Sequence, residues 1–140
     1  MKSLTGLFVC LVLSQTALAN NPLRHFCIIK GGQVVDVNLP SPSTDQVMLC
    51  QFGAALIGAE SLLNLVSKTP SQSITAYQNG AQAPSEGCAD SGGEEVQGTT
   101  LENQSVVFCS FSDGTHIGLD TLKSGPNSSE NSALNQALAP

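Results

Sequence analysis

The sequence predicts a disulfide-stabilised α+β protein in which two tandem helix-hairpin-helix modules share one four-stranded antiparallel sheet. Two observations carry this prediction. The phrase Cys-x-x-x-Gly-Gly occurs at 27–32 and again at 88–93, and each copy is followed by Val-x-x-Cys-x-Phe, at 47–52 and at 106–111. Phrases repeated in this way indicate an internal duplication, with one small module per copy. Because an isolated two-stranded hairpin is only marginally stable, we expect the two hairpins to join in one sheet.

The first nineteen residues have the composition of a secretory signal peptide. Lys2 precedes an apolar run from Leu4 to Leu13, and Ala17-Leu18-Ala19 forms a small-residue cleavage site. Cys10 lies in the middle of the apolar run rather than after a small residue at its end, which argues against a lipid anchor. We therefore expect residues 1–19 to be removed and the protein to be periplasmic or extracellular.

The rest of the chain divides where the composition changes. A first module is expected at 20–66 and a second at 84–123. Between them, 67–83 is a polar stretch that contains Pro70 and Asn79-Gly80, which is typical of a linker. The residues at 124–140 are rich in Ser and Asn with a fading apolar pattern, so they predict a flexible tail that is disordered or loosely helical.

The first module is expected to begin with a helix of about two turns. It starts at Asn21-Pro22 and ends at Gly31-Gly32, because Pro favours the first helical turn and Gly the helix end. The stretch 33–39 then alternates apolar and polar residues, as a half-buried strand does. After a turn rich in Pro and Ser, 46–52 forms the return strand of a β-hairpin.

A second helix is predicted over 54–66, where apolar residues recur at helical spacing. Such a stripe favours a helix that packs on its own sheet over one that binds a partner. The second module repeats the order with weaker signals. Its short helix is expected at 84–93, its strands at 94–98 and 104–111, and a last apolar segment at 115–123.

Four cysteines remain after removal of the signal, and an even number in an exported chain is typical of disulfides. Three pairings are possible, and the duplication selects one of them. A module that was once independent closes its own bond, which gives Cys27 with Cys50 and Cys88 with Cys109. A zinc site formed by His25, His116 and the cysteines is disfavoured, because the chain has no Cys-x-x-Cys pair and no close His pair. No metal and no cofactor is expected.

The charge of the chain excludes several classes of partner. Removal of the signal leaves four cationic side chains against eleven acidic ones, and the cations are scattered at Arg24, Lys30, Lys68 and Lys123. Nucleic-acid binding and attachment to anionic membranes both need clustered Lys and Arg, so neither is expected. No later apolar stretch approaches the roughly 18 residues that span a bilayer, so membrane insertion is not expected either.

The repeated phrases also resemble a known family. Asn21-Pro22 followed by Cys27-x-x-x-Gly31-Gly32, and later Cys109-x-Phe111-x-Asp113-Gly114, is similar to the small exported bacterial domain of unknown function often labelled "putative haemolysin". The resemblance covers one short module at a time and so implies two tandem copies. Members also carry a second cysteine pair and a tryptophan after the Asp-Gly turn, whereas this chain has no tryptophan. No pore-forming or lipid-splitting residues come with the motif.

Candidate catalytic residues gather around His116. It lies three residues after Asp113 and four before Asp120, with Ser110 and Ser112 nearby, so a Ser/His/Asp arrangement can be drawn. The simpler interpretation is a turn at Asp113-Gly114 with a solvated histidine beside it. His25 is interpreted as a surface residue. The adjacent carboxylates Glu94 and Glu95 point to opposite faces of a strand and cannot act as a pair.

The expected function is that of an exported, non-enzymatic binding or structural module. Its partner is expected to be a protein or a component of the cell envelope. A rigid disulfide scaffold presents loops, and loops carry most binding functions, so 39–45 and 112–114 are the candidate binding loops. The alternative is a small hydrolase that uses His116. Replacing His116 by Ala discriminates between the two hypotheses, because only the enzyme depends on the imidazole.

Overall fold

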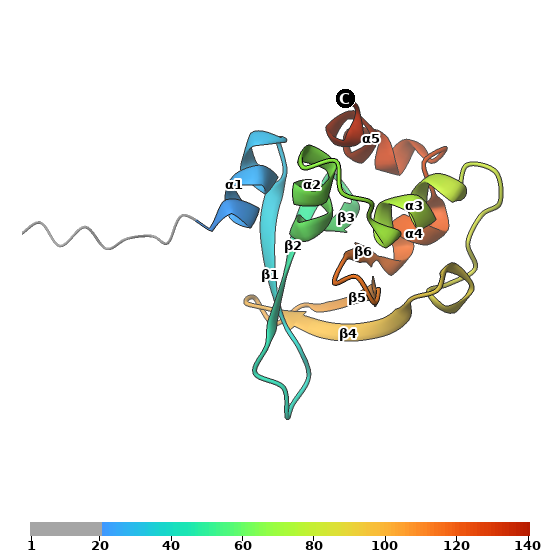
Figure 1. Cartoon of the computed structure of the whole chain (residues 1–140). Helices are drawn as coiled ribbons and strands as arrows, with labels where there is room; N and C mark the ends of the chain where they lie inside the picture. Colours follow the sequence, from blue (N-terminus) through green and yellow to red (C-terminus); the bar gives the residue numbers. More distant parts are fainter. Residues whose placement is uncertain (1–20) are drawn as a thin grey trace, which may run out of the picture.

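Six strands form a closed antiparallel barrel in the computed structural model of the chain, which describes residues 21–140 (Figure 1). The strands are β1 (Gln33–Asn38), β2 (Gln46–Phe52), β3 (Ala55–Gly58), β4 (Glu94–Thr100), β5 (Ser105–Ser110) and β6 (His116–Gly118). The helices are α1 (Pro22–Ile29), α2 (Ala59–Val66), α3 (Gln72–Asn79), α4 (Leu119–Ser124) and α5 (Ser132–Leu138), with short 3₁₀ turns η1 (Ala89–Ser91) and η2 (Ser129–Asn131). The predicted signal peptide at 1–19 lies outside the described residues.

The order around the barrel is β1-β2-β3-β6-β5-β4, so the predicted four-stranded sheet with two helix-hairpin-helix modules is wrong. Each hairpin is extended by a third strand. Strand β3 lies in the segment predicted as a helix at 54–66, and β6 lies in the apolar segment predicted at 115–123. Ile57 of β3 pairs with Ile117 of β6, and Val37 of β1 pairs with Thr100 of β4. These two short seams join the halves at both edges and close the barrel.

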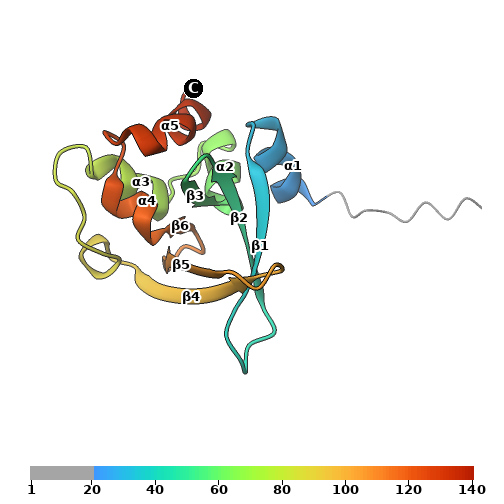
Figure 2. The same cartoon turned by 180° about the vertical axis from the view of Figure 1, so that it is seen from behind.

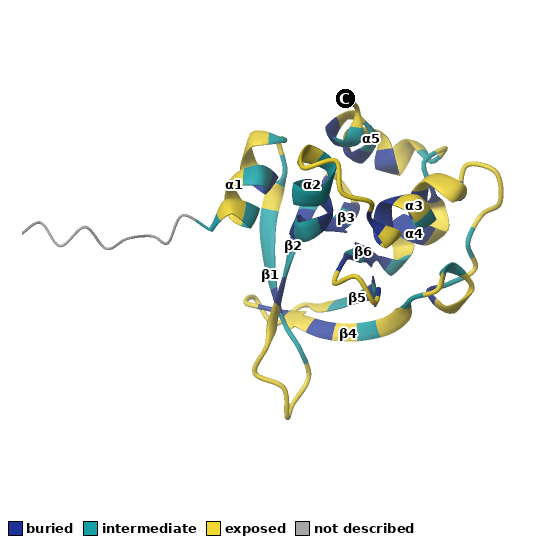
Figure 3. Cartoon of the chain, in the orientation of Figure 1, coloured by how far each residue is buried: buried dark blue, intermediate teal, exposed yellow. Residues whose placement is uncertain are grey.

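The barrel has an apolar interior and a second apolar layer outside its wall. The interior is filled by Val37, Val47, Leu49 and Phe108. Neighbouring residues on the same strands, such as Cys50 and Cys109, point the other way and pack under the helices. The helices lie towards one end of the barrel, and the tip of the β1–β2 hairpin projects from the other (Figures 1 and 2). Buried residues of the helices face the barrel (Figure 3).

The two disulfide bonds lie in the outer layer. Cys27 of α1 is bonded to Cys50, with 5.5 Å between their Cα atoms, and Cys88 is bonded to Cys109, with 5.3 Å. These are the two pairs that the repeated phrases predict. The predicted first helix is also confirmed: Asn21 caps it by accepting a hydrogen bond from the Leu23 amide, and its end is followed by Gly31 at a φ of +85°.

The predicted linker and the predicted flexible tail both contain helices that pack on the barrel. Helix α3 lies in 67–83 and buries Ile74 and Tyr77, and helix α5 lies in 124–140 and buries Leu134. The Tyr77 hydroxyl donates a hydrogen bond of 2.7 Å to Asn135, which joins the two helices. The outer wall of the barrel is apolar, so it is covered by these helices rather than left to solvent. None of the helices within 21–140 is long and apolar enough to cross a membrane.

Candidate functional site

Helix α3 is held on the barrel by the turn between β5 and β6. The Asp113 carboxylate accepts a hydrogen bond of 2.8 Å from the Gln72 amide at the start of α3. Its other oxygen accepts from the Thr115 amide at 3.0 Å and from the Thr115 hydroxyl at 2.6 Å. In return, Gln72 Oε1 accepts from the Asp113 amide and from the Ser112 hydroxyl, both at 3.1 Å. The predicted binding loop 112–114 is therefore engaged with α3.

The environment of Asp113 favours its charged form. Partial burial raises the pKa of the carboxyl, but the hydrogen bonds from Gln72 and Thr115 outweigh this effect, so the pKa lies below the ordinary value. An anionic group at the N-terminus of a helix also interacts favourably with the helix dipole. Asp113 thus both attaches α3 and carries a negative charge at its first turn.

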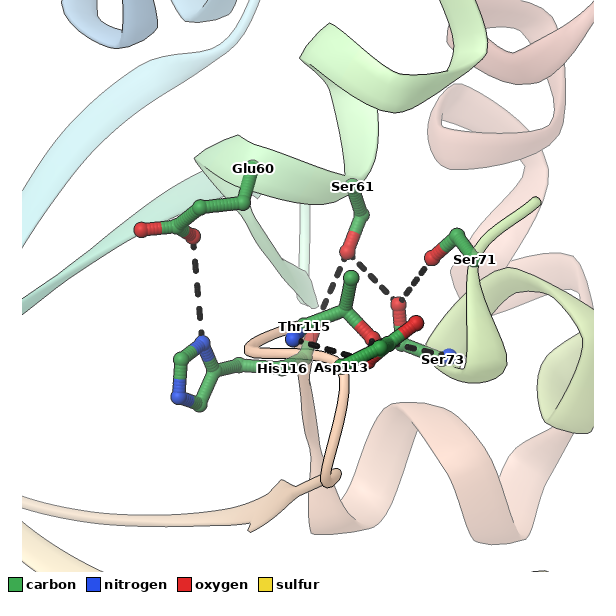
Figure 4. A network of polar contacts seen from close by, with 7 residues as sticks. All are labelled: Glu60, Ser61, Ser71, Ser73, Asp113, Thr115 and His116. Carbon is green, nitrogen blue, oxygen red and sulfur yellow. Dashed lines mark hydrogen bonds and ion pairs between the residues drawn. The ribbon is translucent and has the colours of Figure 1, made fainter. Parts of the chain in front are cut away.

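Behind this contact lies a buried chain of serine hydroxyls (Figure 4). Ser73 shares a hydrogen bond of 2.6 Å with Ser61 of α2 and one of 2.9 Å with Ser71, the N-cap of α3. The Ser73 amide donates to the Thr115 hydroxyl at 3.1 Å. All three serines are buried, and each is satisfied by its neighbours. The chain fixes the position of α3 relative to α2 and to the β5–β6 turn.

An open groove of about 690 Å³ runs beside α3. One wall is the exposed face of α3, the other is the segment 83–91 with η1, and Asp113 lies at the end near the helix N-terminus. The lining residues are small or polar, and none is cationic: Pro70, Ser71, Gln72, Thr75, Ala76, Asn79, Ala83, Pro84, Ser85, Asp90, Ser91 and Asp113. The groove offers hydroxyls, amides and two carboxylates, and has no reactive nucleophile activated by a base.

Asp90 supplies the second carboxylate of the groove. Its Oδ2 accepts a hydrogen bond of 2.9 Å from the Glu86 amide, and the Ser85 hydroxyl lies at 3.5 Å. The Glu86 contact is the main reason that the pKa of Asp90 lies below its ordinary value. Both carboxylates are therefore ionised at neutral pH. Asp90 is held by the Glu86 amide of its own loop, and Asp113 by Gln72 of α3 and by Thr115.

The residues of the alternative Ser/His/Asp arrangement are not brought together. Both oxygens of Asp113 are engaged by Gln72 and Thr115, and Ser112 donates to Gln72. Asp120 is exposed on α4, while Ser110 lies opposite His116 in the β5–β6 pair without a hydrogen bond to it in the described structure. The hydrolase hypothesis stays a prediction, with no hydroxyl aligned on the imidazole within 21–140.

His116 instead faces Glu60, a residue that the sequence reasoning did not single out as a partner. Its Nδ1 lies 3.8 Å from Glu60 Oε2, and its ring meets that of Phe108 edge-on at 5.5 Å. Glu60 is in the first turn of α2, so only the fold brings it close to His116.

The other candidate residues lie apart from this region. His25 is exposed on α1, and Glu94 and Glu95 are both exposed on β4. Within the part of the chain that is described, no group of three or more His, Cys, Asp or Glu side chains is placed to hold a metal ion. The groove residues of α3 were missed by sequence reasoning, because the segment that contains them was interpreted as a linker.

Comparison with known proteins gives no further assignment. No protein-family model matches the chain, and no curated protein or solved structure matches it. The resemblance to the haemolysin-labelled domain and the predicted duplication therefore stay predictions.

Proposed function

We propose that the protein is an exported, non-enzymatic binding module that holds a polar, positively charged peptide segment of a partner protein in the groove beside α3. The observation that carries the proposal is the groove itself, with about 690 Å³ of space and two fixed carboxylates. This volume lies within the range typical of ligand sites. Export is supported by the two disulfide bonds, which persist in oxidising compartments.

The chemistry of the lining favours a peptide with Lys or Arg side chains. Asp90 and Asp113 are charged, and no lining residue is cationic, so a cationic ligand is attracted without competition from the protein's own side chains. Gln72, Thr75 and Asn79 present exposed polar groups along one wall, where a peptide backbone can form hydrogen bonds. The pairing of α3 with the β5–β6 turn keeps this wall in place before the ligand binds, which lowers the entropic cost of binding.

The test measures binding of two fluorescein-labelled peptides by fluorescence anisotropy. One peptide alternates lysine with serine, and the other alternates glutamate with serine. We expect the disulfide-intact protein to bind the lysine peptide, more weakly as salt is added, and not to bind the glutamate peptide. Thr75→Lys places a positive charge on the groove wall and should weaken binding about tenfold or more, because like charges in an interface are strongly unfavourable.

Thr99→Lys is the matched control. Thr99 is an exposed threonine on β4 and lies outside the groove lining, so the same change of charge there should alter the affinity less than about twofold. Equal weakening by the two variants would show that the net charge of the protein, and not the groove, decides binding. Absence of binding to the lysine peptide at low salt would overturn the proposed ligand class.

A further inference from the structure

The Glu60–His116 pair brings together two buried polar atoms that have no hydrogen-bond partner. Among the described residues, Glu60 Oε2 and His116 Nδ1 are the buried side-chain atoms without a hydrogen-bond partner. They face each other at 3.8 Å, as Figure 4 shows, which is within the range of an ion pair but too long for a hydrogen bond. Buried polar atoms of native proteins are nearly always paired, so this exception calls for a physical explanation.

The surroundings leave Glu60 as the charged group that contacts the imidazole. On β5, the residues next to His116 are Ser110 and Phe108, and both are neutral. From β3, Gly58 lies against the His116 backbone and Cβ. The remaining acidic groups nearby are turned away or further off: Asp113 is bonded to Gln72 and Thr115, and Glu94 lies beyond Ser110 on β4.

We propose that Glu60 and His116 form a latch between α2 and β6 that closes on mild acidification. Histidine is the side chain that ordinarily changes charge between pH 5 and 8. A protonated imidazole carries an N–H at Nδ1, which then points at the Glu60 carboxylate, and a small side-chain movement forms a charge-assisted hydrogen bond. Both unpaired atoms are satisfied in that state. A neutral imidazole carries a proton on Nδ1 in only one of its two tautomers, and a bond from that tautomer lacks the positive charge that strengthens the contact.

The sign of the effect follows from which state carries the bond. The bond is present while His116 is protonated and Glu60 ionised, so it stabilises the fold in mildly acidic solution. With a neutral imidazole the contact has no charge assistance, so it is weaker in alkaline solution. The latch therefore makes the attachment of α2 to the barrel firmer near pH 5.5 than near pH 8.

The other half of the barrel supplies a built-in reference without a titratable group. Leu56 stands two residues before Gly58, as His116 stands two before Gly118. Each contacts the glycine of the opposite half, since a Cβ on Gly118 would lie 2.9 Å from Leu56 Cβ and a Cβ on Gly58 would lie 3.1 Å from His116 Cβ. His116→Leu thus introduces the residue that the equivalent position already holds, and it should fold.

The test is urea unfolding of the disulfide-intact protein at pH 5.5 and pH 8.0. We expect the natural protein to have a lower unfolding equilibrium constant at pH 5.5 than at pH 8.0. The ratio of the two constants should shrink by about fivefold in His116→Leu and in Glu60→Gln, because a favourable ion pair contributes about that much. In the double variant the second change should add nothing to the first. His25→Gln alters the exposed histidine and should keep the full pH effect.

Glu60→Gln also separates the latch from the helix dipole. Loss of a negative charge in the first turn of α2 destabilises the helix equally at both pH values, whereas loss of the latch appears only at pH 5.5. If His116→Leu does not fold, Glu60→Gln decides the question alone. A pH effect that is the same in the natural protein and in Glu60→Gln would overturn the proposal.

Discussion

Truncation of Leu134 tests whether the last seventeen residues belong to the folded unit. Leu134 is fully buried on α5, in the same apolar layer as Tyr77 and Leu122. Leu134→Ala removes buried carbons and leaves a cavity that neighbouring groups fill only in part. Because α5 is fixed by hydrogen bonds of Asn131 and Asn135, we expect little collapse around the cavity. The expected loss of unfolding free energy is about 2–5 kcal/mol.

The measurement is urea denaturation of the disulfide-intact protein, followed by far-ultraviolet circular dichroism. The midpoint should fall while the slope stays the same, because the same surface is exposed on unfolding. Ala133→Ser is the control, since Ala133 is exposed on the same helix and the change should cost about 0.5 kcal/mol through helix propensity alone. A loss for Leu134→Ala as small as that of the control would show that α5 does not contribute to the core.

Two further predictions concern the barrel wall and its disulfides. Gly98→Ala should destabilise the protein by about 1–3 kcal/mol, because the new Cβ would clash with Val37 and lie 2.9 Å from the Asn38 carbonyl oxygen. The control is Gly87→Ala, whose Cβ meets only Asp90 Oδ1 at 3.9 Å, so its melting temperature should hardly change. Equal melting temperatures for the two variants would contradict this account of the β1–β4 seam. Non-reducing digestion and mass mapping should find Cys27 joined to Cys50 and Cys88 to Cys109. Removing either bond should lower the free energy of unfolding by roughly 3 kcal/mol in a single transition common to both halves. Separate transitions for the two halves would contradict the shared barrel.

The parts of the fold that the sequence predicts are those in which a local pattern and its physical cause coincide. Asn21-Pro22 and Gly31 mark the ends of α1 because capping and backbone conformation are local effects. The alternating residues of 33–39 mark β1 for the same reason. The cysteine pairing was predicted from the two repeated phrases, and the structure has the same two pairs.

The parts that were missed depend on contacts between distant residues. Strands β3 and β6 have four and three residues and run directly into helices, so their apolar residues look helical. Only the pairing of Ile57 with Ile117 gives them a reason to be extended. Helix α3 shows few apolar residues in sequence, and its position is set by Asp113, which lies 41 residues away from Gln72. No local pattern carries that information.

The groove beside α3 and the Glu60–His116 pair both lie where the two halves of the barrel differ. After Phe52 the first half turns through Gly53 and Ala54 into β3, whereas after Phe111 the second half uses the longer turn Ser112-Asp113-Gly114. The longer turn supplies the carboxylate that anchors α3 and so builds one end of the groove.

The second difference is a change of side chain at one position. Where the first half has the apolar Leu56, the second has His116, whose imidazole lies 3.8 Å from Glu60 on the helix that follows β3. Residues that serve the barrel alone, such as the cysteines and the glycines before and after each hairpin, are alike in both halves. The differences between the two halves are therefore where binding and pH response should first be sought. Thr75→Lys tests the groove that the longer turn helps to form, and His116→Leu tests the changed side chain.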